Sequence, residues 1–313
     1  VLSFLYFGKK LPYTDEELNH IALRKWKECE RRLRSVENPV WVHRLRSVID
    51  YLLKPYKSAP TANHYDKDAT VLDHVIPFMG KHGPGSTASR TRSYVEKCTS
   101  IQYVTDIDRE FFSGPSELGV RRIGHDPLTA LPDGEAWLAA RLANIGTNVP
   151  ASASCLQFVP KTVKTARSIC MEPVENMYFQ QSYLWELSHR ISMSPAGRYI
   201  RFNDQSRNRE LSRVGSSTNR VDTIDLSAAS DSVRTSLVKA IFPPDVLRKL
   251  MASRTQTVKL PDGGLVDVEK FAPMGSALCF PVQSLIFLAS TIYAYLLHMC
   301  DQNDLDIDVI LSS

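Results

Sequence analysis

The amino-acid sequence predicts an α+β fold, in which helices cover one side of a small antiparallel sheet. Three observations support this class. Apolar residues recur at helical spacing in long segments, and short alternating segments bounded by Gly, Pro and Asp are typical of strands. The second half of the chain then reads as strand, helix, hairpin, loop, helix and strand, the order expected of such layers. With 313 residues, 43% of them hydrophobic, the chain can bury a large core.

The N-terminal part contains a helical segment followed by a loop. Residues 15–54 interleave apolar and charged residues and are expected to form helix, with a break at 37–39. The stretch 55–93 is marked by Pro, Gly and Ser, and includes GKHGPGST at 80–87. This loop lacks the ending of a phosphate-binding P-loop, so an ordinary surface loop and an RNA-contacting loop remain equally open.

The other elements follow from the same patterns of spacing and turn residues. Pro243 and Pro244 end a helical pattern, and Pro-Asp-Gly-Gly at 261–264 indicates a hairpin turn. The elements expected in chain order are a helix at 134–145, a basic segment after 158–160, a helix at 176–191, a strand at 221–225, a helix at 228–242, a hairpin over 255–271, a loop at 273–276, a helix ending near 298, and a strand at 305–311.

The charge distribution suggests contact with an anionic partner. The net charge is only +4, but residues 21–58 carry ten Lys or Arg against four acids. Residues 161–220 carry ten against five. Two separate basic regions suit a surface that follows phosphates, although basic helical faces are also commonly just solvated.

Cysteine usage and the apolar segments restrict the class further. The six cysteines lie far apart without a CxxC pair, which argues against a zinc site or a disulfide scaffold and fits a reducing cytosol. The chain starts without Met or a signal-peptide layout, so it is expected to be the interior of a longer protein. The apolar run 285–297 is short for a membrane span, and a buried helix without membrane association is expected.

Asp225 is the first candidate for chemistry, because it ends an apolar segment expected to be a strand. A carboxylate at a strand end can bind a hard cation, and two-metal phosphoryl transfer requires such a carboxylate together with others from a neighbouring strand. Asp231 lies six residues further on, too far along the chain to bind the same ion simply. The structural alternative is that Ser227 or Asp231 merely caps the following helix.

Residues 223–232, TIDLSAASDS, resemble motif A of the levivirus-type replicases, which are RNA-dependent RNA polymerases of RNA bacteriophages. The match is nearly residue for residue. The resemblance implies that Asp225 binds catalytic Mg²⁺. It also implies that Asp231 helps to recognise the ribose 2′-hydroxyl of the incoming nucleotide.

A basic stretch in the family's order agrees with this resemblance. Residues 159–167, VPKTVKTAR, followed by CMEP at 170–173, look like the basic fingers motif. Lys161, Lys164 and Arg167 would neutralise the nucleotide triphosphate and the charge that develops on pyrophosphate. A solvent-facing basic strand is the structural alternative. Residues 204–208 also look familial, without an assigned role.

Residues 274–284 resemble motif B, whose general form is Gly-x3-Thr-x3-Asn before a long helix. The resemblance implies that Gly275, Ser276 and Gln283 contribute to nucleotide binding. Cys279 stands where Thr is commoner, and Gln283 stands where Asn is usual. Gln283 keeps a donor and an acceptor, but the substitution puts its ribose-sensing role in doubt. Packing of a helix end is the structural alternative.

The resemblance implies a right-hand polymerase fold, with a fingers-like region at 1–220 and a partial palm at 221–313. The thumb and the Gly-Asp-Asp hairpin of motif C do not occur in this sequence. The family's properties imply two Mg²⁺ ions, with Mn²⁺ as a substitute. They also imply template and product RNA, nucleoside triphosphates, host translation proteins as partners, and the cytoplasm of an infected bacterium. We expect the 313-residue chain alone not to polymerise nucleotides.

Two other functions remain open. A reverse transcriptase or related palm polymerase would share the Asp225 carboxylate but place an apolar or aromatic gate where Asp231 stands, so ribonucleotide against deoxynucleotide incorporation separates the two. A non-catalytic RNA-binding remnant of a polymerase would bind RNA in a salt-sensitive way without specific Mg²⁺ binding at Asp225. The two basic regions fit both an enzyme and a remnant.

Overall fold

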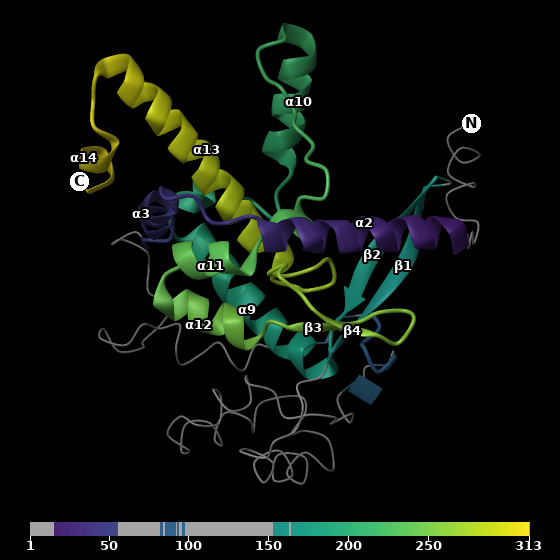
Figure 1. Ribbon diagram of the computed structural model, residues 1–313. Coiled ribbons are helices and arrows are strands. Elements are labelled where there is room, and N and C mark those ends of the chain that lie inside the picture. Colours follow the sequence, from purple (N-terminus) through teal and green to yellow (C-terminus); the bar gives the residue numbers. More distant parts are fainter. Residues whose placement is uncertain are drawn as a thin grey trace, which may run out of the picture.

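The computed structural model describes residues 16–55, short pieces between 82 and 97, and residues 153–312 apart from 163. The expected helix at 134–145 lies outside the described residues, as do positions 80, 81 and 84 of the glycine-rich loop. The described part is a mixed α/β structure with one small sheet (Figure 1). The expected α+β class is therefore right at this level, but the sheet is mixed rather than antiparallel.

The N-terminal helices form as their sequence predicts. α2 (Glu16–Ser35) and α3 (Val42–Leu52) are separated by an irregular segment that contains the expected break. α2 begins with two acidic residues and has Arg32 and Arg34 in its last turn, an arrangement that the helix dipole favours. Its buried positions recur every fourth residue, at Ala22, Trp26 and Glu30, so a single stripe of the helix faces the protein interior.

The sheet has four strands in the order β2-β1-β3-β4. β1 (Ser154–Thr162) and β2 (Thr165–Met171) form one antiparallel hairpin. β3 (Thr257–Lys259) and β4 (Leu265–Asp267) form the hairpin expected around Pro261–Gly264. A short parallel pairing of β1 with β3 joins the two hairpins, and α2 runs across the sheet (Figure 1). A small core beneath α2 consists of Trp26, Leu156, Cys170, Val258, Leu260 and Val268.

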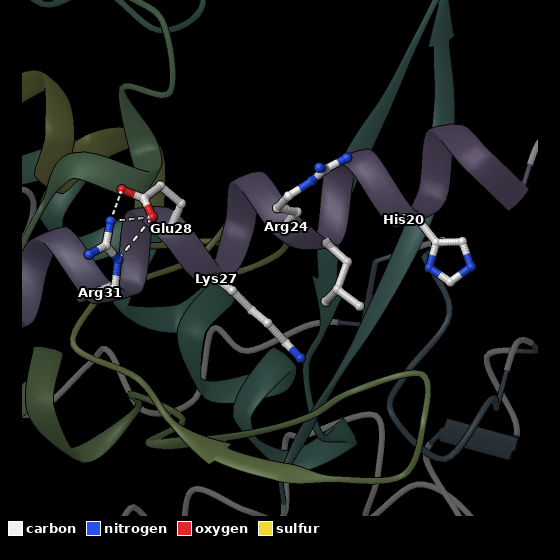
Figure 2. A pocket seen from close by; sticks show the side chains of 6 residues that line it. His20, Arg24, Lys27, Glu28 and Arg31 are labelled. Atoms are coloured by element: carbon white, nitrogen blue, oxygen red, sulfur yellow. Dashed lines mark hydrogen bonds and ion pairs between the residues drawn. The ribbon is translucent and has the colours of Figure 1, made fainter.

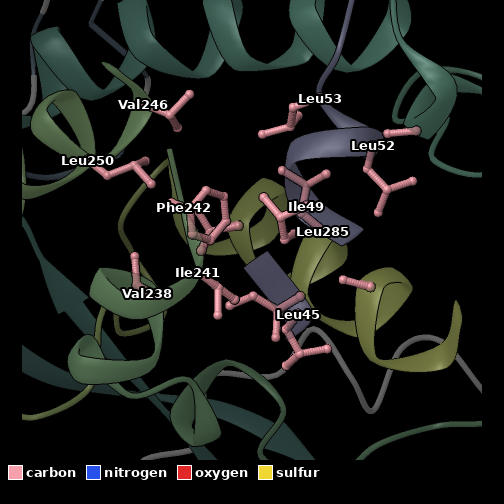
Figure 3. Close-up of a cluster of buried hydrophobic side chains, with 14 of the residues drawn as sticks. Leu45, Ile49, Leu52, Leu53, Val238, Ile241, Phe242, Val246, Leu250 and Leu285 are labelled. Carbon is pink, nitrogen blue, oxygen red and sulfur yellow. The ribbon is translucent and has the colours of Figure 1, made fainter. Parts of the chain in front are cut away.

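The main core lies between helices. In Figure 3, Ile49 and Leu52 of α3 lie near Phe242 and Leu285, and all four side chains are almost completely buried. The helices that surround this core besides α3 are α9 (Val174–Ser192), α11 (Thr235–Ile241), α12 (Pro244–Ala252) and α13 (Cys279–Asn303). The helices expected at 176–191 and up to 298 are therefore confirmed as α9 and α13.

α10 (Ser206–Thr218) stands away from the rest of the described structure (Figure 1). Nearly all of its residues are exposed. Just before its start, the Asp204 carboxylate accepts hydrogen bonds from the backbone N and the hydroxyl of Ser206. These bonds give a structural role to Asp204 in the segment 204–208, for which the sequence suggested no role. A 3₁₀ turn, η2 (Pro195–Arg198), precedes it.

The strand expected at 305–311 is wrong, because these residues form the helix α14 (Ile307–Ser312). Ile307, Ile310 and Leu311 have helical spacing and pack on the main core, a signal that the alternation of Asp306 and Asp308 obscured. Asp306 accepts a hydrogen bond from the backbone N of Asp308. The Asp308 carboxylate in turn forms two hydrogen bonds of 2.8 and 2.7 Å with Arg44 of α3.

The segment around motif A also differs from the expectation. Residues 221–226 are not a strand, and no backbone hydrogen bond joins them to the other described residues. A strand is stable only beside a partner strand, and the apolar spacing of this segment alone cannot supply one. The expected helix at 228–242 is divided into a 3₁₀ turn, η3 (Ser230–Ser232), and α11, because Val233 and Arg234 are extended. As expected, the helical segment ends before Pro243, and Pro244 then begins α12.

α13 is long and apolar enough to cross a membrane by length and composition alone. A core helix of a soluble protein passes the same test, and within the described residues α13 packs against α3, α9 and α14. The helix is longer than its most apolar run, 285–297, suggested. It carries exposed apolar side chains in its first turn and in its second half, such as Phe280 and Tyr295.

Candidate functional site

Asp225 lies on the surface, in the irregular segment that leads from α10 to η3. Its carboxylate forms no hydrogen bond or ion pair with the residues that the structure describes. The flanking residues Ile224 and Leu226 are 84% and 53% exposed, so this segment presents apolar side chains beside a free carboxylate.

The free carboxylate of Asp225 fits part of a divalent-cation site. Mg²⁺ in phosphoryl-transfer sites is commonly held by one or two carboxylates together with substrate phosphates and water. Among the described residues, no group of three His, Cys, Asp or Glu could hold a metal ion. Asp225 can therefore contribute one oxygen ligand, but the described residues do not form a complete site around it.

Asp231 is directed to a different environment by a tight turn. Ala228 has a left-handed φ of 53°, and its carbonyl accepts a hydrogen bond of 3.0 Å from the backbone N of Asp231. The side chain of Asp231 is 23% exposed and lies 3.6 Å from the ammonium of the buried Lys270. Neither η3 nor α11 has a side-chain cap, so the interpretation of Ser227 or Asp231 as a helix cap is wrong.

Lys161, Lys164 and Arg167 lie at the far end of the β1–β2 hairpin, and all three are exposed. The turn is closed by a hydrogen bond of 2.7 Å between the hydroxyls of Thr162 and Thr165. A register shift between Pro160 and Thr162 marks an irregularity beside Lys161. The basic segment is thus a projecting hairpin rather than a single extended strand, and its cations form no ion pair with other described residues.

The motif B loop lies against the free edge of β2. The backbone N of Cys170 donates a hydrogen bond of 2.7 Å to the carbonyl of Met274. Gly275 has φ +129°, and a Cβ at this position would lie 1.9 Å from the carbonyl oxygen of Cys170. Only glycine permits both this conformation and this close approach. The Ser276 hydroxyl accepts a hydrogen bond from Leu278 N, and Gln283 is half-buried in the second turn of α13.

A buried polar network supports the motif B loop from below. The side-chain oxygen of Gln180 accepts a hydrogen bond of 3.1 Å from Ala277 N, and its amide donates one of 2.8 Å to Ser253 O. Nearby, Thr255 donates to the Glu172 carboxylate. Burial raises the pKa of Glu172 to about 7, although hydrogen bonds from Thr255 and its neighbours oppose the shift. The sequence did not predict this network, although it carries a signal for it in the polar residues at positions 176 and 180, which lie on the buried side of α9.

Cys279, the departure from the motif B pattern, lies close to Asp231. Burial first, and the charge of Asp231 second, raise the pKa of the Cys279 thiol to about 12. The group is therefore a neutral thiol at physiological pH. It stands where a threonine hydroxyl would also be neutral.

A shallow hollow of about 370 Å³ follows the exposed flank of α2 (Figure 2). Arg31 is paired with Glu28 at 2.7 Å, so part of the basic charge expected in residues 21–58 is neutralised within the helix. Arg24 and Lys27 point in different directions in Figure 2. The hollow is lined by His20, Leu23, Arg24, Lys27, Glu28 and Arg31.

The amino-acid sequence of this chain is similar to those of a known protein family. A family model described as RNA replicase, beta-chain, matches residues 139–313, more than half of the chain. This chain belongs to the RNA replicase beta-chain family. The matched residues include β1, β2, motif A and motif B, and therefore every site residue expected from the sequence.

Individual relatives in the replicase family agree. The RNA-directed RNA polymerase subunit beta of Enterobacteria phage SP is 44% identical over 131 residues, which are 42% of this chain and 22% of the relative. The subunit of Escherichia virus Qbeta is 41% identical over 129 residues, covering 41% of this chain and 21% of the relative. The RNA-directed RNA polymerase beta chain of Escherichia phage MS2 is 37% identical over 131 residues, covering 42% and 23%. The matched part spans about a fifth of the length of these relatives.

The replicase family match does not include α2 or α3. Even so, α2 contacts both β2 and η3, and therefore reaches the surroundings of Asp231. The structure thus brings an element outside the matched region against the part of the chain that resembles motif A.

Proposed function

We propose that this chain is part of an RNA-directed RNA polymerase that replicates a single-stranded RNA phage genome. Membership of the replicase family supports this function, since the relatives named above are RNA-directed RNA polymerase subunits. The observation that carries the proposal is the motif A loop. It presents a free carboxylate at Asp225 and, one tight turn later, directs Asp231 towards the motif B helix.

Each expected site residue has a role in this proposal. Asp225 binds a divalent cation, Mg²⁺ or Mn²⁺, which when bound supplies positive charge for nucleotidyl transfer by a two-metal mechanism. Lys161, Lys164 and Arg167 neutralise the triphosphate, and their exposure on a projecting hairpin leaves them free to do so. Asp231 contacts the ribose.

The motif B residues complete the nucleotide site in this proposal. Gly275 lets the loop lie against β2, while Ser276 and Gln283 contact the nucleotide. Residues 1–220 would form the fingers and 221–313 part of the palm of a right-hand polymerase. The substrates are nucleoside triphosphates and template RNA. Host translation proteins are further proposed partners, and the cytoplasm of the infected bacterium is the proposed site of action.

The test is the substitution Asp225→Asn in a replicase of full family length that carries this chain. RNA synthesis should fall by about 100-fold or more, as is typical when one electrostatic contact to the transition state is removed. RNA affinity should stay unchanged, because the substitution removes no cation. Asp222→Asn is the matched control, since Asp222 is exposed in the same segment. Synthesis by Asp225→Asn within a few-fold of the wild type would refute the assignment.

The chain by itself is expected to bind RNA without copying it. Two-metal transfer requires carboxylates from a neighbouring strand in addition to Asp225. Template-dependent incorporation by the purified 313-residue chain would contradict this expectation. Salt-sensitive RNA binding by the full-length enzyme without any synthesis would instead favour the non-catalytic remnant.

A further inference from the structure

We propose that Lys270 is a positioning residue, which holds the carboxylate of Asp231 for recognition of the ribose and is itself anchored by Glu30 of α2. This inference rests on the proposed polymerase function and adds two residues to it. Neither Lys270 nor Glu30 belongs to a motif that the sequence singled out.

The environment of Lys270 is unusual for a lysine. Its side chain is 0% exposed, and its ammonium lies 3.6 Å from Asp231 and 3.6 Å from Glu30. The ammonium also lies 4.1 Å from the centre of the Trp26 ring and 3.4 Å from the Trp26 carbonyl oxygen. A buried ammonium is strongly disfavoured unless opposite charges and hydrogen bonds replace its water. These contacts supply that replacement, and a cation over an indole ring adds to it.

The backbone fixes Lys270 beside motif A. Phe271 N donates a hydrogen bond of 2.8 Å to Val233 O, and Thr235 N donates one of 2.9 Å to Glu269 O. These two bonds enclose Lys270, which forms an antiparallel bridge with Arg234, three residues after Asp231. A change in the position of the Lys270 backbone would therefore move the chain next to Asp231 as well.

Glu30 is held so that one of its oxygens faces the lysine. Its Oε2 accepts a hydrogen bond of 2.8 Å from Glu269 N. Its Oε1 is buried and accepts no hydrogen bond from the described residues, so Lys270 provides its neutralising charge. The ammonium is thus shared between two carboxylates. Glu30 is only 5% exposed, whereas Asp231 keeps 23% exposure and can still meet a ligand.

The different exposure of Glu30 and Asp231 is the reason to infer that Lys270 positions Asp231 and does not only stabilise the fold. A pair of Glu30 and Lys270 would already be balanced in charge. Asp231 is an additional, partly open carboxylate that Lys270 contacts from the buried side. Restraining a polar group before its ligand arrives lowers the entropic cost of binding, so loss of Lys270 should weaken discrimination between ribose and deoxyribose.

The experiment compares ribonucleotide and deoxynucleotide incorporation by the full-length replicase and its Lys270→Met variant. The ratio of the two kcat/KM values should fall by about ten-fold, a coupling typical of residues in direct contact. The loss should appear mainly in the KM for ribonucleotides. In an Asp231→Asn background, where the ratio is already low, Lys270→Met should lower it no further.

Two further variants separate positioning from folding. Glu30→Gln combined with Lys270→Met removes the stranded charge on Glu30, so the melting temperature should recover while discrimination stays low. Lys249→Met is the matched control, because Lys249 pairs with the poorly exposed Glu186 at 2.8 Å in the α9–α12 contact. This control should lower the melting temperature without changing the ratio.

The outcomes distinguish this inference from the proposed function. Absence of template-directed synthesis by the wild-type replicase would refute the proposed function. If synthesis occurs and either Lys270 variant retains the wild-type ratio within two-fold, only the positioning role is wrong. An equal fall of the ratio in Lys249→Met would show that general destabilisation is sufficient, and would overturn the inference.

Discussion

Replacement of Glu172 by glutamine should change how the stability of this chain depends on pH. Glu172 directly follows β2, is almost completely buried, and accepts a hydrogen bond from Thr255. Glutamine has nearly the same shape and keeps an oxygen acceptor, but it cannot ionise. The substitution therefore removes the ionisation of this position and leaves most of its contacts in place.

The magnitude follows from the pKa of Glu172, which burial raises from 4.5 to about 7. Each ten-fold change in an ionisation constant corresponds to about 1.4 kcal/mol, so the shift amounts to about 3 kcal/mol. Below pH 4.5 the carboxyl is protonated in both the folded and the unfolded chain, and its contribution to stability is fully present. Between pH 4.5 and 7 the unfolded chain loses the proton first, so this contribution is lost as pH rises.

The assay is urea denaturation of the wild type and Glu172→Gln at pH 5 and pH 8. The free energy of unfolding of the variant, relative to the wild type, should increase by up to about 3 kcal/mol between these values. The variant is compared with the wild type at each pH because His82 also makes stability depend on pH. Burial lowers the pKa of His82 to about 4, which gives a pH dependence of opposite sign that is the same in both proteins. Glu210→Gln is the control without an effect between pH 5 and pH 8, since a hydrogen bond from Arg213 lowers the pKa of Glu210 and its contribution changes only below pH 4.5.

A difference between the variant and the wild type that stays the same at pH 5 and pH 8 would refute this reasoning. It would mean that Glu172 ionises in the folded chain as easily as in the unfolded one. Water or a cation would then have to reach the carboxylate beneath the motif B loop.

Two further predictions concern packing. Gly275→Ala should lower the free energy of unfolding by about 3 kcal/mol or more, because its Cβ would meet the Cys170 carbonyl at 1.9 Å in addition to the backbone strain. The control is Gly263→Ala, at a position with φ +88° and no atom within 4 Å of the added Cβ, which should lower the free energy of unfolding by only about 1 kcal/mol in the same denaturation assay. Equal losses in the two variants would contradict the clash at Gly275. Phe242→Ala should lower the free energy of unfolding by about 3–5 kcal/mol, because this side chain is 0% exposed. Phe280→Ala, at 62% exposure, should lower it by less than about 0.5 kcal/mol. Similar effects of the two substitutions would place Phe242 outside the core.

The long helices and one hairpin could be predicted because their signals are local. α2, α9 and α13 each place apolar residues at helical spacing, and turn residues at 261–264 mark the hairpin of β3 and β4. The strand expected at 305–311 failed because its apolar residues fit both periods. Packing of Ile307 on the main core and the ion pair of Asp308 with Arg44 favour helix there.

Among the site residues too, local sequence patterns indicate some positions and not those that depend on distant contacts. The loop position of Gly275 could be predicted, because glycine before a long helix is a visible pattern, and the structure adds its close contact with β2. The role of Gly275 in nucleotide binding stays a prediction. Lys270 could not be predicted, since in the sequence it is one lysine among the basic residues around a hairpin. Its burial depends on Glu30, 240 positions earlier in the chain.

By itself, the sequence determined the family and most helices, because these depend on local patterns of residues, and it predicted the site residues of motifs A and B. Only the tertiary structure decided the parallel contact of β1 with β3, the division of the helix expected after Asp231, and the ion cluster around Lys270. Each of these brings together groups that are distant along the chain. Charge burial and strand pairing gain free energy only when such groups meet, so no local pattern records them.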